Sequence, residues 1–303
     1  MPERPSRPPL EFLYPGQHDS INERIGFDIV AVHGLGSNVD WSWVWKGHNK
    51  QVHWLKDPDM LPAAVPNARI MAYSYESRWH IDAPKTHLGL LGEELARTLH
   101  GVRAKELDRP ILFIAHSLGG LVVMHSLLYA DRTDDLKYLP LKTIGFVALG
   151  TPFRGTRMQS LAKIVSRLLS FLGSNDKVID DLGLDNESLT EKVHEFCQLR
   201  NKLQIPSWCF IEQLESDYGE KAGVPGLFKG IVVEEASAHI PGWGRTGLNT
   251  DHFYLNKFSG PNDGSFMAIS REISLMYAGI HADTEPSRMR RKIGTSTPLC
   301  RMG

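Results

Sequence analysis

The chain has 303 residues, 42% of them hydrophobic and 23% charged, with a formal net charge of −1 and a pI near 6.9. This length and composition indicate a globular protein with one large domain or two small ones, and they argue against a nucleic-acid binder, which would carry a strong basic excess. The three cysteines, Cys197, Cys209 and Cys300, are scattered without CxxC spacing, which argues against a disulfide framework and against a zinc site.

The N-terminus, MPERPSRPPL, has four prolines and no apolar run, so it does not resemble a secretory signal. No segment approaches the roughly 18 consecutive apolar residues that a membrane span needs. We therefore expect a soluble, cytoplasmic protein, and leave open a peripheral contact with a mitochondrial or ER membrane. Residues 1–24 are expected to form a flexible arm.

Apolar and β-branched runs alternate with segments of helical periodicity, which predicts a mostly parallel, doubly wound α/β sheet. A single domain over residues 25–281 is expected, with a helical insertion at about 157–204. The polar, basic residues 282–303 are expected to be a disordered tail. The expected strands are 27–32, 68–75, 110–115, 143–149, 207–212 and 229–235, and the expected main helices are 86–105, 119–130, 187–203 and 265–277.

The strongest motif lies where the strand ILFIA meets the helix GLVVMHSLL. The sequence there is Ala115-His116-Ser117-Leu118-Gly119. In G-x-S-x-G elbows, a serine nucleophile occupies a strained strand-to-helix turn, and small flanking residues let the two backbones approach. Ala115 replaces the first glycine and is still small. We therefore predict that Ser117 is a nucleophile, against the alternative of an ordinary helix-capping serine.

An oxyanion hole needs two backbone N–H donors aimed at the reacting carbonyl oxygen. The residue after the nucleophile, Leu118, is the first candidate because it lies at the N-terminus of a helix. The second is expected in the loop after the first strand, His33-Gly34-Leu35-Gly36, where the N–H of Leu35 is the candidate.

A serine nucleophile needs a histidine base late in the chain and an acid between the two in sequence. His252, in the loop before the last helix, is preferred to His239, which follows the last expected strand too closely, and to His281, which lies beyond that helix. The first choice for the acid is Glu212, at the end of the strand SWCFIE, and the alternative is Glu235. Glu215 and Asp217 follow Glu212 closely and stay open.

Five segments together resemble the serine-active-site α/β-hydrolases of the SERAC1-like and DUF676 lipase-like group. They are HGLGSNVDWSWVW, WLKDPDMLPAAVPNARIMAYSYES, AHSLGGLVVMHSLL, FVALGTPFRGT and DHFYLNKFSGPND. Fungal relatives often carry such a domain N-terminal to NACHT or NB-ARC domains. The resemblance implies an α/β-hydrolase fold over about residues 26–280, with Ser117 as nucleophile, His252 as base and an acid near the strand SWCFIEQL. The chain departs from the family pattern at Ala115 and at Phe153, where relatives have histidine beside the site.

Some apolar residues near these motifs have two interpretations. Trp41, like Trp43 and Trp45, either lines an acyl pocket or caps the core. Phe153 is a second candidate for contact with the substrate. The apolar stripe of residues 157–172 packs on the sheet by default and is a lid in the alternative interpretation. The basic residues 288–292 are expected to be solvated rather than to bind phospholipid headgroups.

The expected function is hydrolysis of a carboxylic ester, a lipid ester above all, by a Ser-His-acid triad through an acyl-enzyme, without cofactor or metal. The expected partner is a small-molecule or lipid ester, with no nucleic acid, and the oligomeric state is left open. One alternative is a signalling or interaction module whose hydrolase activity is weak or lost. Another is a thioesterase or peptidase that uses the same triad, because specificity depends on pocket shape.

Overall fold

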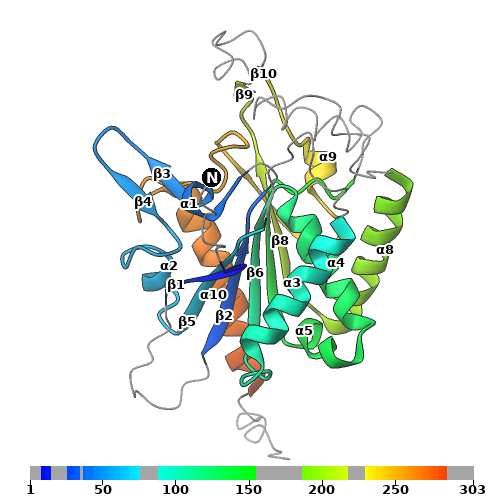
Figure 1. Cartoon of the computed structure of the whole chain (residues 1–303). Helices are drawn as coiled ribbons and strands as arrows, with labels where there is room; N and C mark the ends of the chain where they lie inside the picture. Colours follow the sequence, from blue (N-terminus) through cyan, green and yellow to red (C-terminus); the bar gives the residue numbers. More distant parts are fainter. Residues whose placement is uncertain are drawn as a thin grey trace, which may run out of the picture.

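The structure is a computed structural model that describes residues 8–14, 26–34, 37–75, 88–154, 186–217 and 229–284. Within these ranges the chain forms a seven-stranded sheet with helices on both faces (Figure 1). Two small two-stranded sheets lie beside it. One pairs β3 (Val44–Lys46) with β4 (Gln51–His53), and the other pairs β9 (Ser216–Asp217) with β10 (Lys229–Gly230).

The main sheet has the strand order β1-β5-β2-β6-β7-β8-β11. All neighbouring pairs are parallel except the edge pair β1 and β5, which is antiparallel. The strands are β1 (Leu10–Tyr14), β2 (Phe27–Val32), β5 (Ala68–Tyr73), β6 (Ile111–His116), β7 (Thr143–Leu149), β8 (Ser207–Glu212) and β11 (Gly244–Leu248).

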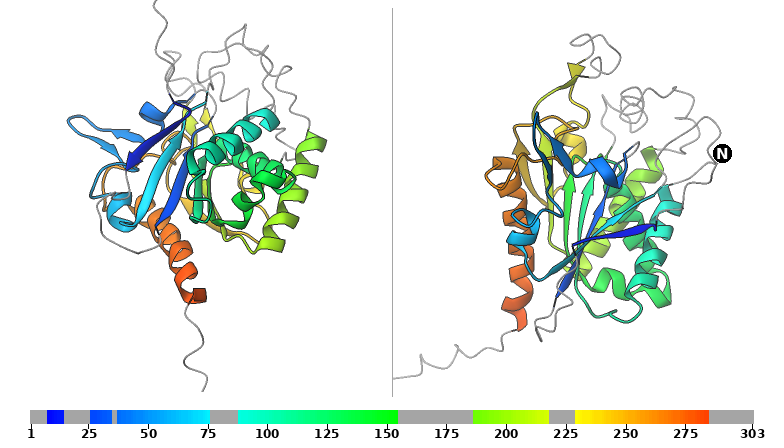
Figure 2. Two further views of the ribbon diagram at one scale, coloured as in Figure 1. Left: turned by 60° about the horizontal axis from the view of Figure 1, so that its bottom comes forward. Right: turned by 60° about the vertical axis from the view of Figure 1, so that its left-hand side comes forward.

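Helices cover both faces of this sheet (Figure 2). One face carries α3 (Leu88–Arg103), α4 (Gly119–Asp131) and α8 (Asn186–Leu203). The other carries α1 (Val39–Ser42), α2 (Leu61–Ala64) and the long α10 (Gly264–Thr284). The short elements η1 (Asp134–Leu136), α5 (Tyr138–Leu141) and α9 (Glu235–Ala238) complete the described residues.

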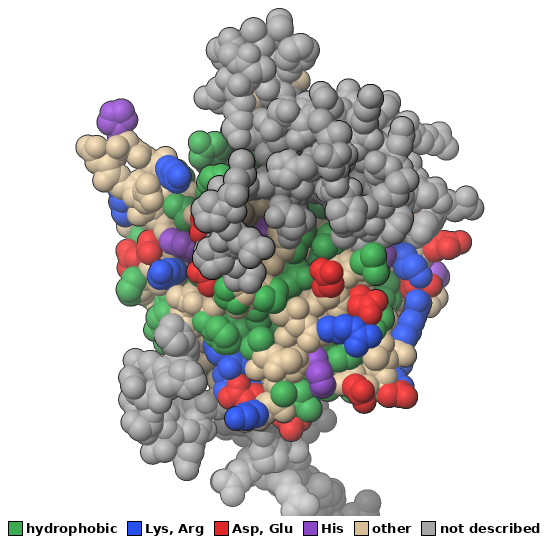
Figure 3. All heavy atoms as spheres, viewed as in Figure 1, with side chains coloured by type: hydrophobic (Ala, Val, Ile, Leu, Met, Phe, Trp, Pro, Cys, Tyr) green, Lys and Arg blue, Asp and Glu red, His purple; other side chains and the backbone are tan. Residues whose placement is uncertain are grey.

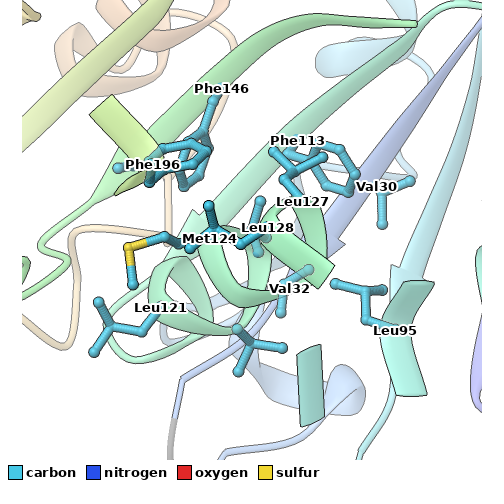
Figure 4. Close-up of a cluster of buried hydrophobic side chains, with 14 of the residues drawn as sticks. Val30, Val32, Leu95, Phe113, Leu121, Met124, Leu127, Leu128, Phe146 and Phe196 are labelled. Carbon is cyan, nitrogen blue, oxygen red and sulfur yellow. The ribbon is translucent and has the colours of Figure 1, made fainter. Parts of the chain in front are cut away.

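The apolar strands of the sequence are the central strands of this sheet. Every residue of β2, β5 and β6 is buried, as expected for parallel strands that are covered on both faces. Alternate residues serve alternate faces: Val30 and Val32 pack toward α3 and α4, whereas Ile29 and Ala31 pack toward α2 and α10. Figure 4 shows the first of these clusters, where strand side chains meet those of α4.

Two strands of the sheet differ from the sequence-based expectation. Residues 10–14, LEFLY, lie in the expected flexible arm but form the edge strand β1 on β5. The last strand of the sheet is β11, GRTGL, which pairs with β8. The expected strand 229–235 instead contributes only the two-residue β10, and Glu235 begins α9. Both missed strands are short edge strands, and the two glycines of β11 interrupt the apolar, β-branched pattern by which a strand is recognised in sequence.

The expected insertion at 157–204 also needs a correction. Its second half is α8, which lies in the connection between the adjacent parallel strands β7 and β8 and packs on α4. It is therefore the ordinary crossover helix of an α/β unit. The first half, including the 157–172 stripe, lies outside the described residues. At the C-terminus, α10 continues to Thr284, beyond the expected boundary at 281, and residues 285–303 lie outside the description.

Charges of both signs intermix over the helical layer seen in Figure 3. Arg97 pairs with Glu93 along α3 at 2.9 Å, and Arg132 reaches from the end of α4 to Glu195 of α8 at 2.8 Å. This distribution agrees with the near-neutral net charge of the chain.

A buried carboxylate, Asp28, lies near the start of β2, at the edge of the sheet where the parallel strands begin. Arg69 of β5 binds both of its oxygens, with Nε 2.7 Å from Oδ1 and Nη2 3.0 Å from Oδ2. Arg103, from the end of α3, donates to Oδ2. Two strands and a helix are thereby held together by one carboxylate.

Replacement of Asp28 by Asn is expected to lower the free energy of unfolding by about 3–5 kcal/mol, because buried Arg103 loses its counter-charge and Arg69 keeps only the partly exposed Glu106, at 2.8 Å. Urea unfolding of the full chain measures this loss. Asp134→Asn is the matched control, because Asp134 pairs with Lys137 on the exposed surface and its removal should leave stability almost unchanged. Equal losses for the two variants would contradict a structural role for the Asp28 cluster.

Candidate active site

The candidate site lies where the parallel strands end. In the sheet, β2 is followed along the chain by β5 on one side and β6 by β7 on the other, so the strand order reverses between β2 and β6. In open α/β sheets, ligands bind at the carboxyl ends of the strands at such a switch point. The residues singled out from the sequence occupy this edge of the sheet. Ser117 follows β6, Glu212 ends β8 and His252 follows β11.

Ser117 occupies a sharp strand-to-helix turn. Its φ is +53°, a left-handed conformation that is rare for residues other than glycine, and its N–H donates to the carbonyl of Leu149 at 2.8 Å. Helix α4 then passes so close to β2 that a Cβ on Gly119 would stand 2.4 Å from the carbonyl oxygen of His33. Only glycine fits at that position, as a nucleophile elbow requires.

His252 and Glu212 form a buried hydrogen bond. His252 Nδ1 lies 3.0 Å from Glu212 Oε2, and both side chains are completely buried. The other carboxylate oxygen, Oε1, accepts the backbone N–H of Val233 at 2.7 Å. Because a carboxylate can only accept, Nδ1 carries the imidazole proton and Nε2 is left as the basic nitrogen.

The imidazole of His252 lies next to the elbow. Gly150, which follows the carbonyl that holds Ser117, has φ +58°, and a Cβ there would stand 3.0 Å from His252 Nδ1. His116 and His252 have ring centroids 4.9 Å apart. Within the part of the chain that the structure describes, Ser117 Oγ and His252 Nε2 are both buried without a hydrogen-bond partner. The hydrogen bond between them is therefore not formed here, and such bonds often tighten only with substrate bound.

The backbone of His252 is held on both sides. His116 Nε2 donates to its carbonyl at 3.0 Å, and its N–H donates to Ser216 Oγ at 3.3 Å. Burial, together with the neighbouring His252, keeps the pKa of His116 well below its usual range, so His116 is neutral. Sequence reasoning missed both residues, although the position of His116 beside the nucleophile was a usable signal.

Of the two oxyanion candidates, Leu118 is described and lies at the N-cap position of α4, where helix N–H groups lack intrahelical partners. Leu35 lies outside the described residues. The described start of its loop borders the nucleophile, since a Cβ on Gly34 would stand 2.9 Å from Ser117 Cβ. The Tyr75 hydroxyl donates to the carbonyl of His33 at 2.8 Å and its ring stacks on the His33 imidazole, which fixes where this loop begins.

The remaining candidates lie apart from His252 or inside the core. Glu235 begins α9, is largely exposed and pairs with Arg245 at 2.9 Å, so the structure brings Glu212 and not Glu235 to His252. Phe153 is fully buried and packs edge-on against Phe146 and Trp243, which is a core position rather than the expected substrate contact. Trp41 is half-exposed on α1.

The described residues hold neither a metal-binding cluster nor a membrane-spanning helix. Nowhere in them do three or more His, Cys, Asp or Glu side chains gather as a metal site would require. Among the described helices, none has the length and apolar character needed to cross a bilayer.

The amino-acid sequence is similar to that of known proteins. The family "Putative serine esterase (DUF676)" matches residues 29–177. The chain is SERAC1-like and DUF676-like. It is 26% identical to protein SERAC1 of Danio rerio over 78% of this chain and 37% of that protein, and 29% identical to "Putative lipase ROG1" of Saccharomyces cerevisiae over 52% and 22%. The chain thus spans about a third or less of the length of these two relatives.

Among solved structures, the mature form of lipase BlEst2 from Bacillus licheniformis matches with a TM-score of 0.54. The match covers 87% of this chain and 99% of that one at 16% identity. A likeness at this identity concerns the fold alone. The fold of the SERAC1-like chain is accordingly that of the α/β-hydrolases.

Burial makes the stability of this site dependent on pH. Burial lowers the pKa of His33 to about 4, whereas an unfolded histidine titrates near 6.5. Between these values the unfolded chain binds the additional proton, so the contribution of neutral His33 to stability is present above pH 6.5 and is lost as the pH falls toward 4. His33→Asn should make the dependence of the unfolding free energy on pH shallower by up to about 1.4 kcal/mol per pH unit.

Urea unfolding at about pH 7, 6 and 5 measures this dependence. His48→Asn is the control, since His48 is exposed and its variant should run parallel to the unmodified chain. Parallel curves for His33→Asn as well would contradict the expected neutral, buried imidazole.

Proposed function

We propose that this chain hydrolyses carboxylic esters, lipid esters above all, with Ser117 as nucleophile, His252 as general base and Glu212 as the acid of the triad. The observation that carries the proposal is the buried bond from His252 Nδ1 to Glu212, which leaves Nε2 as the nitrogen without a hydrogen-bond partner, next to an elbow whose serine has a left-handed conformation. A base with one nitrogen fixed and the other free is the arrangement that nucleophilic catalysis by serine needs.

The reaction begins when Ser117 Oγ attacks the ester carbonyl carbon while His252 Nε2 takes the hydroxyl proton. The carbonyl oxygen becomes an oxyanion that the N–H groups of Leu118 and Leu35 stabilise. Glu212 stabilises the imidazolium through Nδ1–H. The tetrahedral intermediate then expels the alcohol oxygen, which takes the proton from Nε2 and leaves an acyl group on Ser117.

Water completes the cycle. His252 Nε2 removes a proton from the water as its oxygen attacks the acyl carbon, and a second oxyanion forms in the same hole. Collapse of this intermediate breaks the bond to Ser117 Oγ, which regains its proton from His252. The products are one alcohol and one carboxylic acid, and no cofactor takes part.

The proposal of a lipid ester rests on the likeness to "Putative lipase ROG1" and to lipase BlEst2, and on half-exposed Trp41 in α1 as an apolar side chain available for contact. A peripheral contact with a mitochondrial or ER membrane would bring such a substrate within reach and is part of the same proposal. Thioester or peptide hydrolysis would use the same groups. An interaction module with weak or lost activity is the alternative from another class, and the unformed bond between Ser117 Oγ and His252 Nε2 is the observation in its favour.

A fluorophosphonate probe, which phosphonylates activated serines, tests the nucleophile and the base together. We expect one adduct on Ser117, located by mass spectrometry of peptides, and none on Ser117→Ala. His252→Ala should slow labelling by about 10²–10⁴-fold, the usual contribution of general base catalysis. Well-folded chain that does not label would refute the proposed hydrolase and favour the interaction module.

The acid has a test with a matched control. Glu212→Gln keeps the shape of the side chain but removes the charge that holds the His252 tautomer, and should lower kcat for an ester substrate by about 10²–10⁴-fold. Glu235→Gln makes the same chemical change on an exposed glutamate and should leave kcat unchanged. The assignment of Glu212 is wrong if both variants keep full activity, and Glu235 takes its place if only Glu235→Gln loses it.

A further inference from the structure

The segment that carries His252 is tied to a distant part of the chain by one residue, Asn256. Its amide Nδ2 donates to the carbonyl of Ser42 at 2.5 Å, and its own backbone carbonyl accepts Trp54 Nε1 at 2.9 Å. Both partners lie more than 200 residues away in sequence. Asn256 is 1% exposed, so both contacts are buried.

The Ser42 end of this link lies in the short helix α1. Ser42 is the last residue of α1, and α1 follows the loop that contains Leu35. α1 has only four residues and is closed by its own local bonds, from Ser42 N–H to the carbonyl of Asn38 at 3.0 Å and from Asp40 N–H to Asn38 Oδ1 at 3.0 Å. So short a helix has little stability of its own and depends on contacts to the rest of the fold.

The surroundings of the link are apolar. Trp54 packs edge-on against Trp43 at 5.9 Å and against Phe258 at 5.1 Å between ring centroids. Water cannot easily replace a donor that is lost among such side chains, so the Ser42 carbonyl would be left unpaired. The buried hydrogen bond therefore fixes the position of Asn256 relative to Ser42 more strongly than a similar bond at the surface would.

Between Asn256 and His252 the chain is a series of tight turns. Tyr254 N–H donates to the carbonyl of Asp251 at 3.3 Å, and Lys257 N–H donates to the carbonyl of Tyr254 at 3.1 Å. A displacement of Asn256 is passed to His252 because the intervening residues have little freedom to absorb it.

We infer that Asn256 is a positioning residue that sets the position of the general base His252 by joining residues 252–258 to α1. The inference rests on the proposed function, since it assigns to Asn256 the placement of the proposed base. Within the described residues, Asn256 makes no hydrogen bond to Ser117 or His252. It acts through the Ser42 carbonyl and Trp54.

Two substitutions and one control test the inference. Asn256→Ala removes the donor, and Asn256→Asp replaces it with a carboxylate that faces the Ser42 carbonyl, so the second change should be the more damaging. Thr143→Val is the control: it removes a buried side-chain hydrogen bond of 2.7 Å, to the carbonyl of Leu139, where β7 begins, at the opposite edge of the sheet. All variants are assayed as full chains well below their unfolding temperatures.

The first measurement is the rate constant for fluorophosphonate labelling of Ser117, with kcat and KM for an ester substrate. We expect Asn256→Ala to lower the labelling rate and kcat by roughly 10-fold and Asn256→Asp by roughly 100-fold, with little change in KM, because a misplacement of about 1 Å has effects of this size. Thr143→Val should keep the rate of the unmodified chain even if it is equally destabilised. Labelling of both Asn256 variants at the unmodified rate would overturn the inference.

The second measurement does not need turnover. The Nδ1 proton of His252, bonded to Glu212, should give a far-downfield proton NMR signal that Glu212→Gln removes. We expect this signal to shift or broaden in both Asn256 variants and to stay in place in Thr143→Val. If the unmodified chain does not label on Ser117, the proposed function fails, and an unchanged NMR signal in the Asn256 variants would then separately refute the positioning role.

Discussion

The whole site depends on one steric constraint, the close approach of helix α4 to strand β2. With a left-handed Ser117, the chain turns from β6 into α4 within a few residues, and the absence of a side chain at Gly119 lets the helix reach the His33 carbonyl. The strain at Ser117 persists because its N–H is bonded to Leu149 and because α4 is buried almost throughout. The helix N-terminus, the nucleophile and the first oxyanion donor therefore share one rigid element.

Burial then decides the charge state of the groups around the serine. His33 and His116 are shielded from water, and this lowers the pKa of each imidazole, so both are uncharged near neutral pH. Glu212 differs because its two oxygens receive donors from two segments, Val233 N–H and His252 Nδ1. A buried carboxylate with both oxygens bonded is an adequate counter-charge for an imidazolium, whereas an exposed glutamate such as Glu235 would be screened by solvent.

Much of this could be predicted from the sequence because its signals are local. The strands β2, β5 and β6 are covered on both faces and appear as continuous apolar runs, and the elbow combines a strand, a serine and small residues within a few positions. The strand β11 was not predicted, because an edge strand with two glycines lacks such an apolar run. The choice between Glu212 and Glu235 depended on β11, since its parallel pairing with β8 brings the segment after Leu248 to the end of β8, where Glu212 lies. Nothing in the sequence indicates that the Val233 N–H donates to Glu212.

The base, His252, lies between β11 and α10, on neither a strand nor a long helix. Each of the other parts supplies one bond to its segment: His116, beside the nucleophile, binds the His252 carbonyl; Ser216, just beyond the acid, accepts the His252 N–H; and Ser42, after the oxyanion loop, accepts Asn256. The sheet positions Ser117 and Glu212 by its own backbone pairing, but the position of His252 depends on these three long-range contacts. The residues that govern catalysis should therefore differ from those that govern stability, such as Asp28 at the opposite edge of the sheet, because the two groups act through separate sets of contacts.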